Sequence, residues 1–241
     1  MDSKSASPHR AIAHHVAFYD MDRTITKTGT YSGFLLFVAW RRQSWRLLAL
    51  PLVALAGLAY LMGALGRSQL KALNLRMLIG SKFRADEIAP LVELYADRVV
   101  KHGLYAAALD QIAQDRAAGY RLVLATASFR LYVDAIARRL GIEDVLATEL
   151  VASENGAFLH AELAGDNCYG DAKFARIEAW VALQGIQREQ AYIRAYSDHV
   201  SDHPMLGFAD EGIATTPSRK LHQMARARGW RIVDWREGAA H

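Results

Sequence analysis

The chain has 241 residues, of which 52% are hydrophobic and 22% are charged, a composition that excludes an intrinsically disordered protein. Its length is sufficient for one domain with a substantial insertion, and its formal net charge is +4. A single cysteine, Cys168, excludes an intrachain disulfide and fits a reducing compartment. The first 15 residues contain no apolar segment of signal-peptide length, so no secretion signal is predicted there.

The charge is distributed unevenly along the chain. From Arg23 to Ala85 there is no Asp or Glu, whereas the same span contains ten basic residues. The rest of the chain therefore contains 19 basic and 25 acidic residues, a net charge of −6. Such an asymmetry indicates an anionic partner for the basic segment.

The first predicted strand, residues 11–20, ends in two carboxylates. Asp20 and Asp22 are two residues apart, and Thr24 follows two residues later. In α/β folds the chemical groups lie at the carboxyl ends of the strands, where the chain turns and both carboxylates can face one ligand. This arrangement suits a nucleophile, a proton donor and an oxygen-ligated cation. Taken alone, the same residues also suit a loop of solvated aspartates with a threonine helix cap.

A long apolar stretch follows. Residues 26–30 are predicted to form a polar flap and residues 31–40 a helix, and residues 47–66 are then uncharged over the length of a bilayer-spanning helix. A single crossing is excluded if Asp20, before this stretch, must meet catalytic residues that come after it. We therefore expect a re-entrant hairpin or a helix in the membrane interface. The alternative is a water-soluble cap whose apolar helices pack on each other or on a second subunit.

The remaining pattern predicts an α/β fold in which a Rossmann-like parallel sheet carries an inserted, all-helical cap domain. Residues 1–26 and 102–241 are expected to form the core, and residues 27–101 the basic and hydrophobic cap, with two amphipathic helices between residues 68 and 101. Further helices are predicted over residues 104–118, 129–140, 173–183 and 219–228. Further strands are predicted over residues 122–125, 144–152, 157–162, 191–196, 212–216 and 231–235, with a hairpin turn at residues 154–156.

Polar residues in three later stretches of the chain complete a recognisable set. Together with Asp20 and Asp22, its members are Thr126 and Ser128 after a strand, Lys173 at a helix start, and Asp198 and Asp202 after another strand. In this order the residues resemble the haloacid dehalogenase superfamily of phosphatases, and in particular its phosphoserine-phosphatase-like branch. The resemblance extends from Val16 to about Trp235, nearly the whole chain.

The resemblance implies a phosphomonoester hydrolase that acts through an aspartyl-phosphate intermediate. Asp20 would attack phosphorus, and Asp22 would protonate the leaving oxygen and then deprotonate the attacking water. Mg²⁺ is the implied cofactor, with the carboxylates of Asp20 and Asp198 and the backbone carbonyl of Asp22 as its ligands.

The resemblance also assigns the residues that hold the phosphate. Thr126 and the backbone amide of Ala127 would bind the phosphoryl oxygens, and Lys173 would add a positive charge. Asp202 would hold Lys173 or a metal-bound water. The two histidines beside the last two acids receive no role, because a His-x₃-His pair in a loop is a weak metal signal.

Two features of the sequence bear on the substrate. Nine residues after the nucleophile, phosphoserine phosphatases have a Glu that contacts the substrate amine, whereas this chain has Gly29. Phosphoserine is therefore disfavoured. The block of residues 34–65 looks like the hydrophobic cap insertion of phosphatidylglycerophosphatase C, a membrane-associated member of this branch.

We therefore expect a membrane lipid phosphate as substrate, such as phosphatidylglycerophosphate or a lysophospholipid phosphate. The enzyme would be cytoplasmic, peripheral or re-entrant at the inner face of the cytoplasmic membrane, with an anionic membrane surface and no nucleic acid as partner. The apolar cap could also form an oligomer. One alternative is a soluble phosphatase of a small metabolite, such as an amino-alcohol or amino-acid phosphate. The other is a non-catalytic membrane-surface binding protein.

Overall fold

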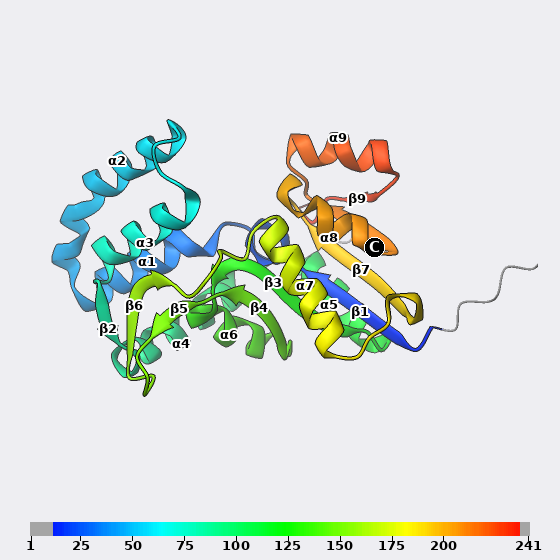
Figure 1. Ribbon diagram of the computed structural model, residues 1–241, viewed down its shortest axis with the longest axis horizontal. Helices are drawn as coiled ribbons and strands as arrows, with labels where there is room; N and C mark the ends of the chain where they lie inside the picture. The colour runs from blue at the N-terminus through cyan, green and yellow to red at the C-terminus, as the bar shows by residue number, and fades with distance from the viewer. Residues whose placement is uncertain (1–11, 237–241) are drawn as a thin grey trace, which may run out of the picture.

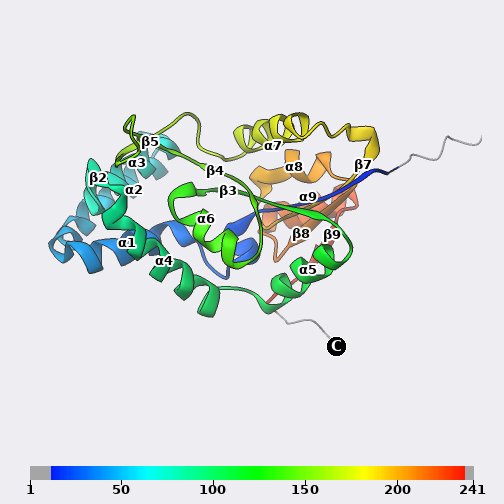
Figure 2. The ribbon, with the colours of Figure 1, turned by 90° about the horizontal axis from the view of Figure 1, so that it is seen from below.

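The computed structural model, which describes residues 12–236, has a six-stranded sheet between two layers of helices and a helical lobe at one end (Figures 1 and 2). The sheet order is β4-β3-β1-β7-β8-β9, and all five neighbouring pairs are parallel. Its strands are β1 (His14–Tyr19), β3 (Arg121–Phe129), β4 (Asp144–Thr148), β7 (Ala191–Ser197), β8 (Glu211–Thr215) and β9 (Arg231–Val233). The predicted parallel α/β architecture is confirmed.

Helices cover both faces of the sheet. One face packs against α5 (Ala106–Ala117) and α6 (Arg130–Arg139). The other packs against α7 (Asp171–Leu183), α8 (His203–Phe208) and α9 (Arg219–Arg228), with the short turns η3 (Arg188–Gln190) and η4 (Val200–Asp202) between elements. Ala17 and Tyr19 of β1 point into the first layer, and Val16 and Phe18 into the second. A strand that is buried on both faces reads as a continuous apolar run, as this one does.

The helical lobe lies between β1 and α5 in the chain. It contains α1 (Thr30–Arg42), η2 (Ser44–Ala49), α2 (Leu50–Leu61), α3 (Arg67–Leu78) and α4 (Ala85–His102). Buried side chains of α1, α3 and α4 join the apolar cluster under the sheet, and the Phe34 ring stacks on that of Tyr132 in α6 at 4.4 Å between centroids. By contrast, α2 buries only Ala56 and lies at the outer edge of the lobe (Figure 1).

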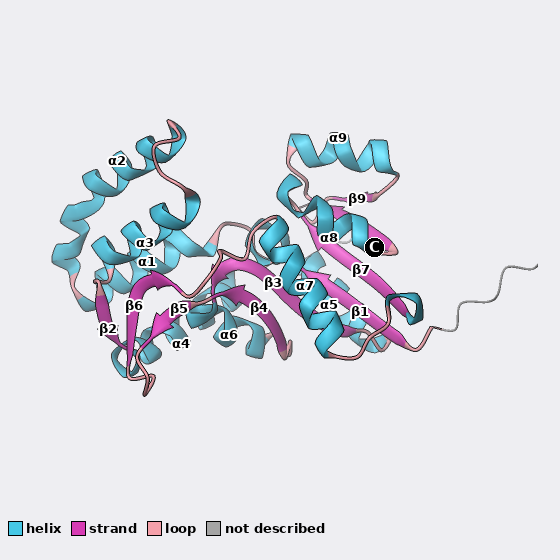
Figure 3. Ribbon diagram, viewed as in Figure 1, coloured by secondary structure: helices cyan, strands magenta, loops and turns pink. Residues whose placement is uncertain are grey.

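The predicted helical cap is present, and it departs from an all-helical structure at one short strand. A short strand, β2 (Lys82–Arg84), pairs antiparallel with β6 (Phe158–Leu163), which also pairs with β5 (Leu150–Ala152). The three form a small second sheet at the end of the molecule where the lobe lies (Figure 3). The strand predicted over residues 144–152 is likewise divided, because β4 belongs to the parallel sheet while β5 turns into the small one. The predicted β5–β6 hairpin is present.

A buried network ties α5 to the two central strands. The carboxylate of Asp115, fully buried on α5, accepts hydrogen bonds from the hydroxyls of Tyr19 (2.6 Å) and Tyr196 (2.8 Å) and from the Arg194 guanidinium (2.6 Å). Burial raises the pKa of both tyrosines, so they remain neutral donors. Since Tyr19 directly precedes Asp20, this network fixes the end of β1 against α5.

Candidate active site

The carboxyl ends of β1, β3 and β7 meet at one pocket of about 300 Å³. Because β1 pairs with both β3 and β7, residues at or just beyond the carboxyl ends of these three strands lie side by side. All seven predicted site residues line the pocket: Asp20, Asp22, Thr126, Ala127, Lys173, Asp198 and Asp202.

The turn after β1 brings two carboxylates with a spacing of two to the same pocket. The chain leaves the strand in η1 (Met21–Ile25), a single wide helical turn that is interrupted at Asp22 and Arg23. Arg23 has φ 62°, in the left-handed region that non-glycine residues seldom adopt. The Thr26 hydroxyl accepts from the Arg23 backbone N–H at 3.2 Å and holds this turn closed. Local strain therefore accompanies the placement of Asp22 beside Asp20.

A buried ion cluster forms the base of the pocket. The Lys173 Nζ donates to Asp20 Oδ1 and to Asp202 Oδ2, both at 2.8 Å, and the Ser197 hydroxyl also donates to Asp202. Burial raises the pKa of Asp20, and the Lys173 ammonium opposes this rise. Burial lowers the pKa of Lys173, but Asp20 and Asp202 more than compensate and leave it raised. Lys173 is thus a permanent cation beside Asp20.

Gly170 explains how the chain delivers Lys173 to this position. Gly170 precedes α7 with φ 56° and ψ −128°, a conformation that favours glycine. The helix starts at Asp171, which places Lys173 in the first turn with its side chain buried in the site. The predicted helix start at Lys173 is therefore two residues late.

Asp198 and Asp20 are linked by a threonine. The Thr24 hydroxyl donates to Asp20 Oδ2 at 3.0 Å, lies 3.4 Å from Asp198 Oδ1, and accepts from the Asp198 backbone N–H at 3.0 Å. Burial, followed by the charge of Asp202, raises the pKa of Asp198 to about 6. The third residue of the DxDxT pattern thus has a structural role of its own, as a bridge between the two carboxylates.

The donor set fits a hard divalent cation. Three buried carboxylates, those of Asp20, Asp198 and Asp202, lie together here, and the Lys173 ammonium pairs with Asp20 and Asp202. Asp202 Oδ1 is buried without a hydrogen-bond partner among residues 12–236. Within the same range, no three Asp, Glu, His or Cys side chains form a complete metal cage. A cation here would also need backbone or substrate oxygens, as expected for Mg²⁺ with the Asp22 carbonyl as a ligand.

Asp22 connects the site to the first helix of the lobe. Its carboxylate accepts from the Thr30 backbone N–H (2.6 Å), the Thr30 hydroxyl (2.7 Å) and the Ser128 hydroxyl (2.6 Å). Thr30 is the first residue of α1, so Asp22 satisfies a free N–H at the helix start. Ser128 had no predicted role, although its position near the carboxyl end of β3 was a signal for one.

Lys71 is a site component that the sequence analysis missed. This buried lysine on α3 donates to the backbone carbonyl of Ala127 (2.5 Å) and to Asn167 Oδ1 (2.9 Å), and its ammonium lies 4.3 Å from the ring centroid of Phe129. Burial lowers the pKa of Lys71 to about 7. The lobe thereby holds the segment predicted to bind phosphate in place.

Three further residues line the pocket. The Arg67 guanidinium, from the start of α3, stacks on the ring of Tyr169 at 3.8 Å, and both side chains line the pocket. His199 also lines it and its ring accepts from the Ser201 backbone N–H, whereas His203 is not among the lining residues. Arg67, which the sequence analysis counted only as a charge, thus joins Arg23 and Lys173 as a cation that lines the pocket.

Comparison with known proteins agrees with this geometry. The model of the family described as haloacid dehalogenase-like hydrolase matches residues 17–207. A "Probable phosphatase Rv3661" of Mycobacterium tuberculosis is 28% identical over 92% of this chain and 76% of its own length. A crystal structure of a Bordetella pertussis protein of unknown function is 25% identical, with a TM-score of 0.82 over 92% of this chain and 99% of that chain. A phosphoserine phosphatase in the form of a phospho-aspartyl intermediate analogue has the same fold, with a TM-score of 0.61, 19% identity, and coverage of 93% and 96%.

The depressed pKa of Lys71 leads to a stability prediction. Between a folded pKa of about 7 and the unfolded value of 10.5, the unfolded chain binds a proton that the folded chain does not. The contribution of Lys71 to stability is therefore least favourable at pH 7 and below, and it increases as the pH rises through this window. We expect the free energy of unfolding of the wild type, minus that of Lys71→Met, to rise by about 1 kcal/mol per pH unit above pH 7.

Urea denaturation at pH 7, 8 and 9 in the presence of a chelator measures this difference. Lys101→Met, which removes an exposed lysine on α4, is the matched control and should leave the pH slope unaltered. Equal slopes for the wild type and Lys71→Met would show that the folded pKa of Lys71 is close to 10.5.

Proposed function

Since the chain belongs to the haloacid dehalogenase-like hydrolases and is a phosphatase, we propose that it hydrolyses a lipid phosphomonoester at a membrane surface, with Asp20 as nucleophile and Mg²⁺ as cofactor. The observation that carries the lipid assignment is the exposed apolar face of η2 and α2. The observation that supports the mechanism is the ion cluster of Asp20, Lys173 and Asp202 at the carboxyl end of β1.

The proposed reaction has two steps. In the first, an Asp20 carboxylate oxygen forms a bond to phosphorus, the bond from phosphorus to the leaving oxygen breaks, and that oxygen takes a proton from Asp22. In the second, Asp22 takes a proton from water, whose oxygen attacks phosphorus and releases inorganic phosphate and the Asp20 carboxylate. Mg²⁺, held by Asp20, Asp198 and the Asp22 carbonyl, would neutralise charge on the phosphoryl group.

The hydrogen-bond partners of Asp22 suit its two proposed roles, as proton donor in the first step and proton acceptor in the second. Asp22 must carry a proton before the first step, and it accepts three hydrogen bonds in the arrangement described above. Two of these come from the hydroxyls of Thr30 and Ser128, which can reverse because a hydroxyl both donates and accepts. Asp22 can therefore be accommodated in both protonation states without movement of the backbone.

The lobe exposes an unusual amount of apolar surface. The segment Ser44–Leu61 is long and apolar enough to cross a membrane by length and composition, yet only 6% of it is buried. The exposed large side chains in or next to this segment are Trp40, Trp45, Leu48, Leu50, Leu52, Leu55, Leu58, Leu61 and Met62, and Leu36 and Leu94 are exposed elsewhere in the lobe. Contiguous apolar patches of this kind mark interaction sites with proteins or membranes.

We favour a membrane over a protein partner for this face, because charge and topology agree with it. The segment lies in a stretch with ten basic and no acidic residues, which suits an anionic leaflet, and the aromatic side chains Trp40 and Trp45 are typical of membrane interfaces. A single crossing would place Asp20 and Lys173 on opposite sides, whereas their side chains lie 2.8 Å apart. The proposed location is thus the interface at the inner face of the cytoplasmic membrane.

One observation supports a second candidate function, a soluble phosphatase of a small polar metabolite. A separate pocket of about 260 Å³ beside Asp22 is lined by the polar side chains of Tyr31, Ser32 and Asn74. Asn74 Oδ1 is buried and has no hydrogen-bond partner within residues 12–236. A small leaving group with a hydroxyl or ammonium donor could satisfy it.

The catalytic assignment predicts that Asp20→Asn abolishes phosphate release. Loss of the nucleophile should lower kcat by at least about a hundredfold, and chelation of divalent cations should have the same effect on the wild type. Release of inorganic phosphate from p-nitrophenyl phosphate provides the assay, and far-ultraviolet circular dichroism checks the fold of the variant. Wild-type turnover that survives chelation would exclude the metal, and turnover by Asp20→Asn would exclude the nucleophile.

The substrate assignment predicts a ranking of kcat/KM. Lipid phosphomonoesters in mixed micelles, such as phosphatidylglycerophosphate, should exceed phosphoserine by at least about tenfold, because Gly29 offers no carboxylate to the serine amine. The same phosphate assay, with and without detergent micelles, gives both values. The reverse ranking would support the small-metabolite function and the pocket around Asn74.

The membrane assignment predicts flotation with anionic vesicles. Vesicles of phosphatidylglycerol and phosphatidylethanolamine should carry the wild type to the top of a density gradient, less in high salt but not to zero, because salt screens only the charges. Combined replacement of Leu52, Leu55 and Leu58 by Asp should weaken binding by at least about tenfold.

Leu183→Asp is the matched control, because this leucine on α7 is 83% exposed and lies outside the lobe. It should float as the wild type does. A wild type that stays at the bottom of the gradient at every salt concentration would contradict the membrane assignment. If gel filtration then showed a dimer that the triple variant lacks, the apolar face would be a subunit interface instead.

A further inference from the structure

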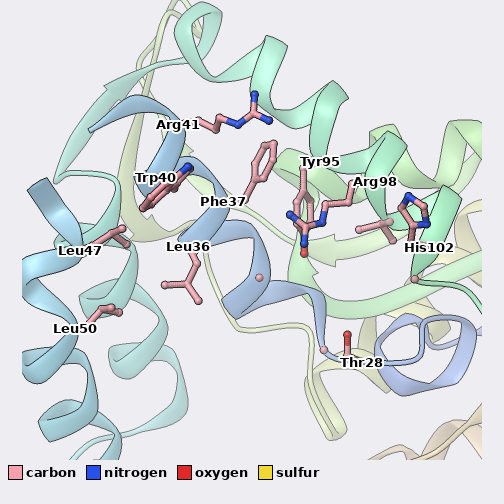
Figure 4. Close-up of a pocket in the computed structure, with 14 residues that line it drawn as sticks. Thr28, Leu36, Phe37, Trp40, Arg41, Leu47, Leu50, Tyr95, Arg98 and His102 are labelled. Atoms are coloured by element: carbon pink, nitrogen blue, oxygen red, sulfur yellow. The ribbon is translucent and has the colours of Figure 1, made fainter. Parts of the chain in front are cut away.

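A further cavity, of about 710 Å³ and larger than the two described above, lies along α1 on the side that faces α4 (Figure 4). This volume is within the range of small-molecule sites in proteins. The apolar part of its lining comes from α1, η2, the start of α2, and α4, and consists of Leu36, Phe37, Trp40, Leu47, Leu50 and Val99. We call this cavity the α1 groove.

The α1 groove also has a cationic side. Arg41, Arg98 and His102 line it, and its lining contains no carboxylate. Within residues 12–236, neither Arg41 nor Arg98 forms an ion pair, whereas the neighbouring Arg42 is paired with Glu87. In Figure 4, Arg98 and His102 lie on the Thr28 side, and Leu47 and Leu50 lie at the opposite end. The groove therefore combines two guanidinium groups with an apolar end, which suits an anionic amphiphile.

Gly29 joins the α1 groove to the phosphate pocket. It lines both cavities, and a Cβ atom placed on it would meet no atom within 4 Å. Its φ of −63° would allow any side chain, so the backbone does not require glycine here. What glycine supplies at this position is open space between the two cavities.

We propose that the α1 groove binds an acyl chain of the lipid whose phosphomonoester lies against Asp20, with the leaving group passing over Gly29. This inference rests on the proposed lipid substrate and deepens it. The apolar end of the groove is continuous with the proposed membrane-facing surface, because Leu50 belongs to both. A chain could thus leave the bilayer and enter the groove without crossing water, while the guanidinium groups face the anionic headgroup region.

The experiment uses soluble monoalkyl phosphates, from butyl to dodecyl, below their micelle concentrations. If methylene groups are buried in the groove, the wild-type kcat/KM should rise by up to about fourfold for each added methylene group. Leu36→Asp and Leu50→Asp should flatten this dependence, since each places a charge on the groove lining. Both leucines are about 40% exposed, so the variants should keep their thermal stability. Leu183→Asp is again the control and should retain the full chain-length dependence.

Two further measurements test the passage and direct binding. Gly29→Phe should raise the KM for dodecyl phosphate by more than tenfold relative to Gly29→Ala, which leaves most of the space open. Dodecylphosphonate, which has no scissile phosphorus–oxygen ester bond, should change the wild-type tryptophan emission, and Trp40→Phe should lose most of this change because Trp40 lines the groove.

The outcomes separate this inference from the function on which it rests. A wild-type kcat/KM that does not depend on chain length, or a dependence that persists in both Asp variants, would overturn the groove as the chain site. Because the alkyl phosphates are soluble, a failure to float with vesicles would remove the membrane location and leave this test intact. Hydrolysis of lipid micelles by Leu50→Asp at the wild-type rate would support the lipid substrate and contradict the groove.

Discussion

An ammonium group buried between two carboxylates holds the catalytic end of this protein together. Lys173 comes from the start of α7, Asp20 from the end of β1 and Asp202 from η4, yet one nitrogen bonds both acids at 2.8 Å. Without this cation the buried carboxylates would repel each other, and their burial would favour the protonated forms. The hydrogen bonds that Tyr19 and Tyr196 donate to Asp115 on α5 fix the ends of β1 and β7, the strands that Asp20 and Asp198 follow. The charge of Lys173 thus connects the fold to the chemistry.

The part of the site that follows from the sheet could be predicted from the sequence. Asp20, Thr126 and Asp198 each come directly after an apolar run or within its last residues, and parallel strands place their carboxyl ends on one edge. Short buried strands that alternate with amphipathic helices leave few alternative topologies. For this reason the sequence could predict that these residues lie close together. It could not predict which hydrogen bonds they form.

The part that depends on the lobe could not be predicted in the same way. Lys71 lies in an amphipathic helix, where a lysine normally indicates the solvated face, and only the packing of α3 on the core shows that it is buried against Ala127. Three-residue strands such as β2 are too short to show a periodic pattern, and their partners come from distant sequence. The burial of Lys71 and the pairing of β2 with β6 both depend on tertiary packing, which sequence periodicity does not encode.

The pairing of β2 with β6 limits how a substrate reaches the site. A rigid swing of the lobe away from the core would break this backbone ladder between Lys82–Arg84 and Phe158–His160, together with the contact of Lys71 with Ala127. A hinged lid is therefore disfavoured, and the proposed passage over Gly29 needs no such movement. If the substrate is the proposed lipid, it would reach the site by lateral diffusion in its leaflet, without desorption into the cytosol. Under such conditions the rate of turnover depends on the surface density of substrate in the leaflet, and not on its bulk concentration.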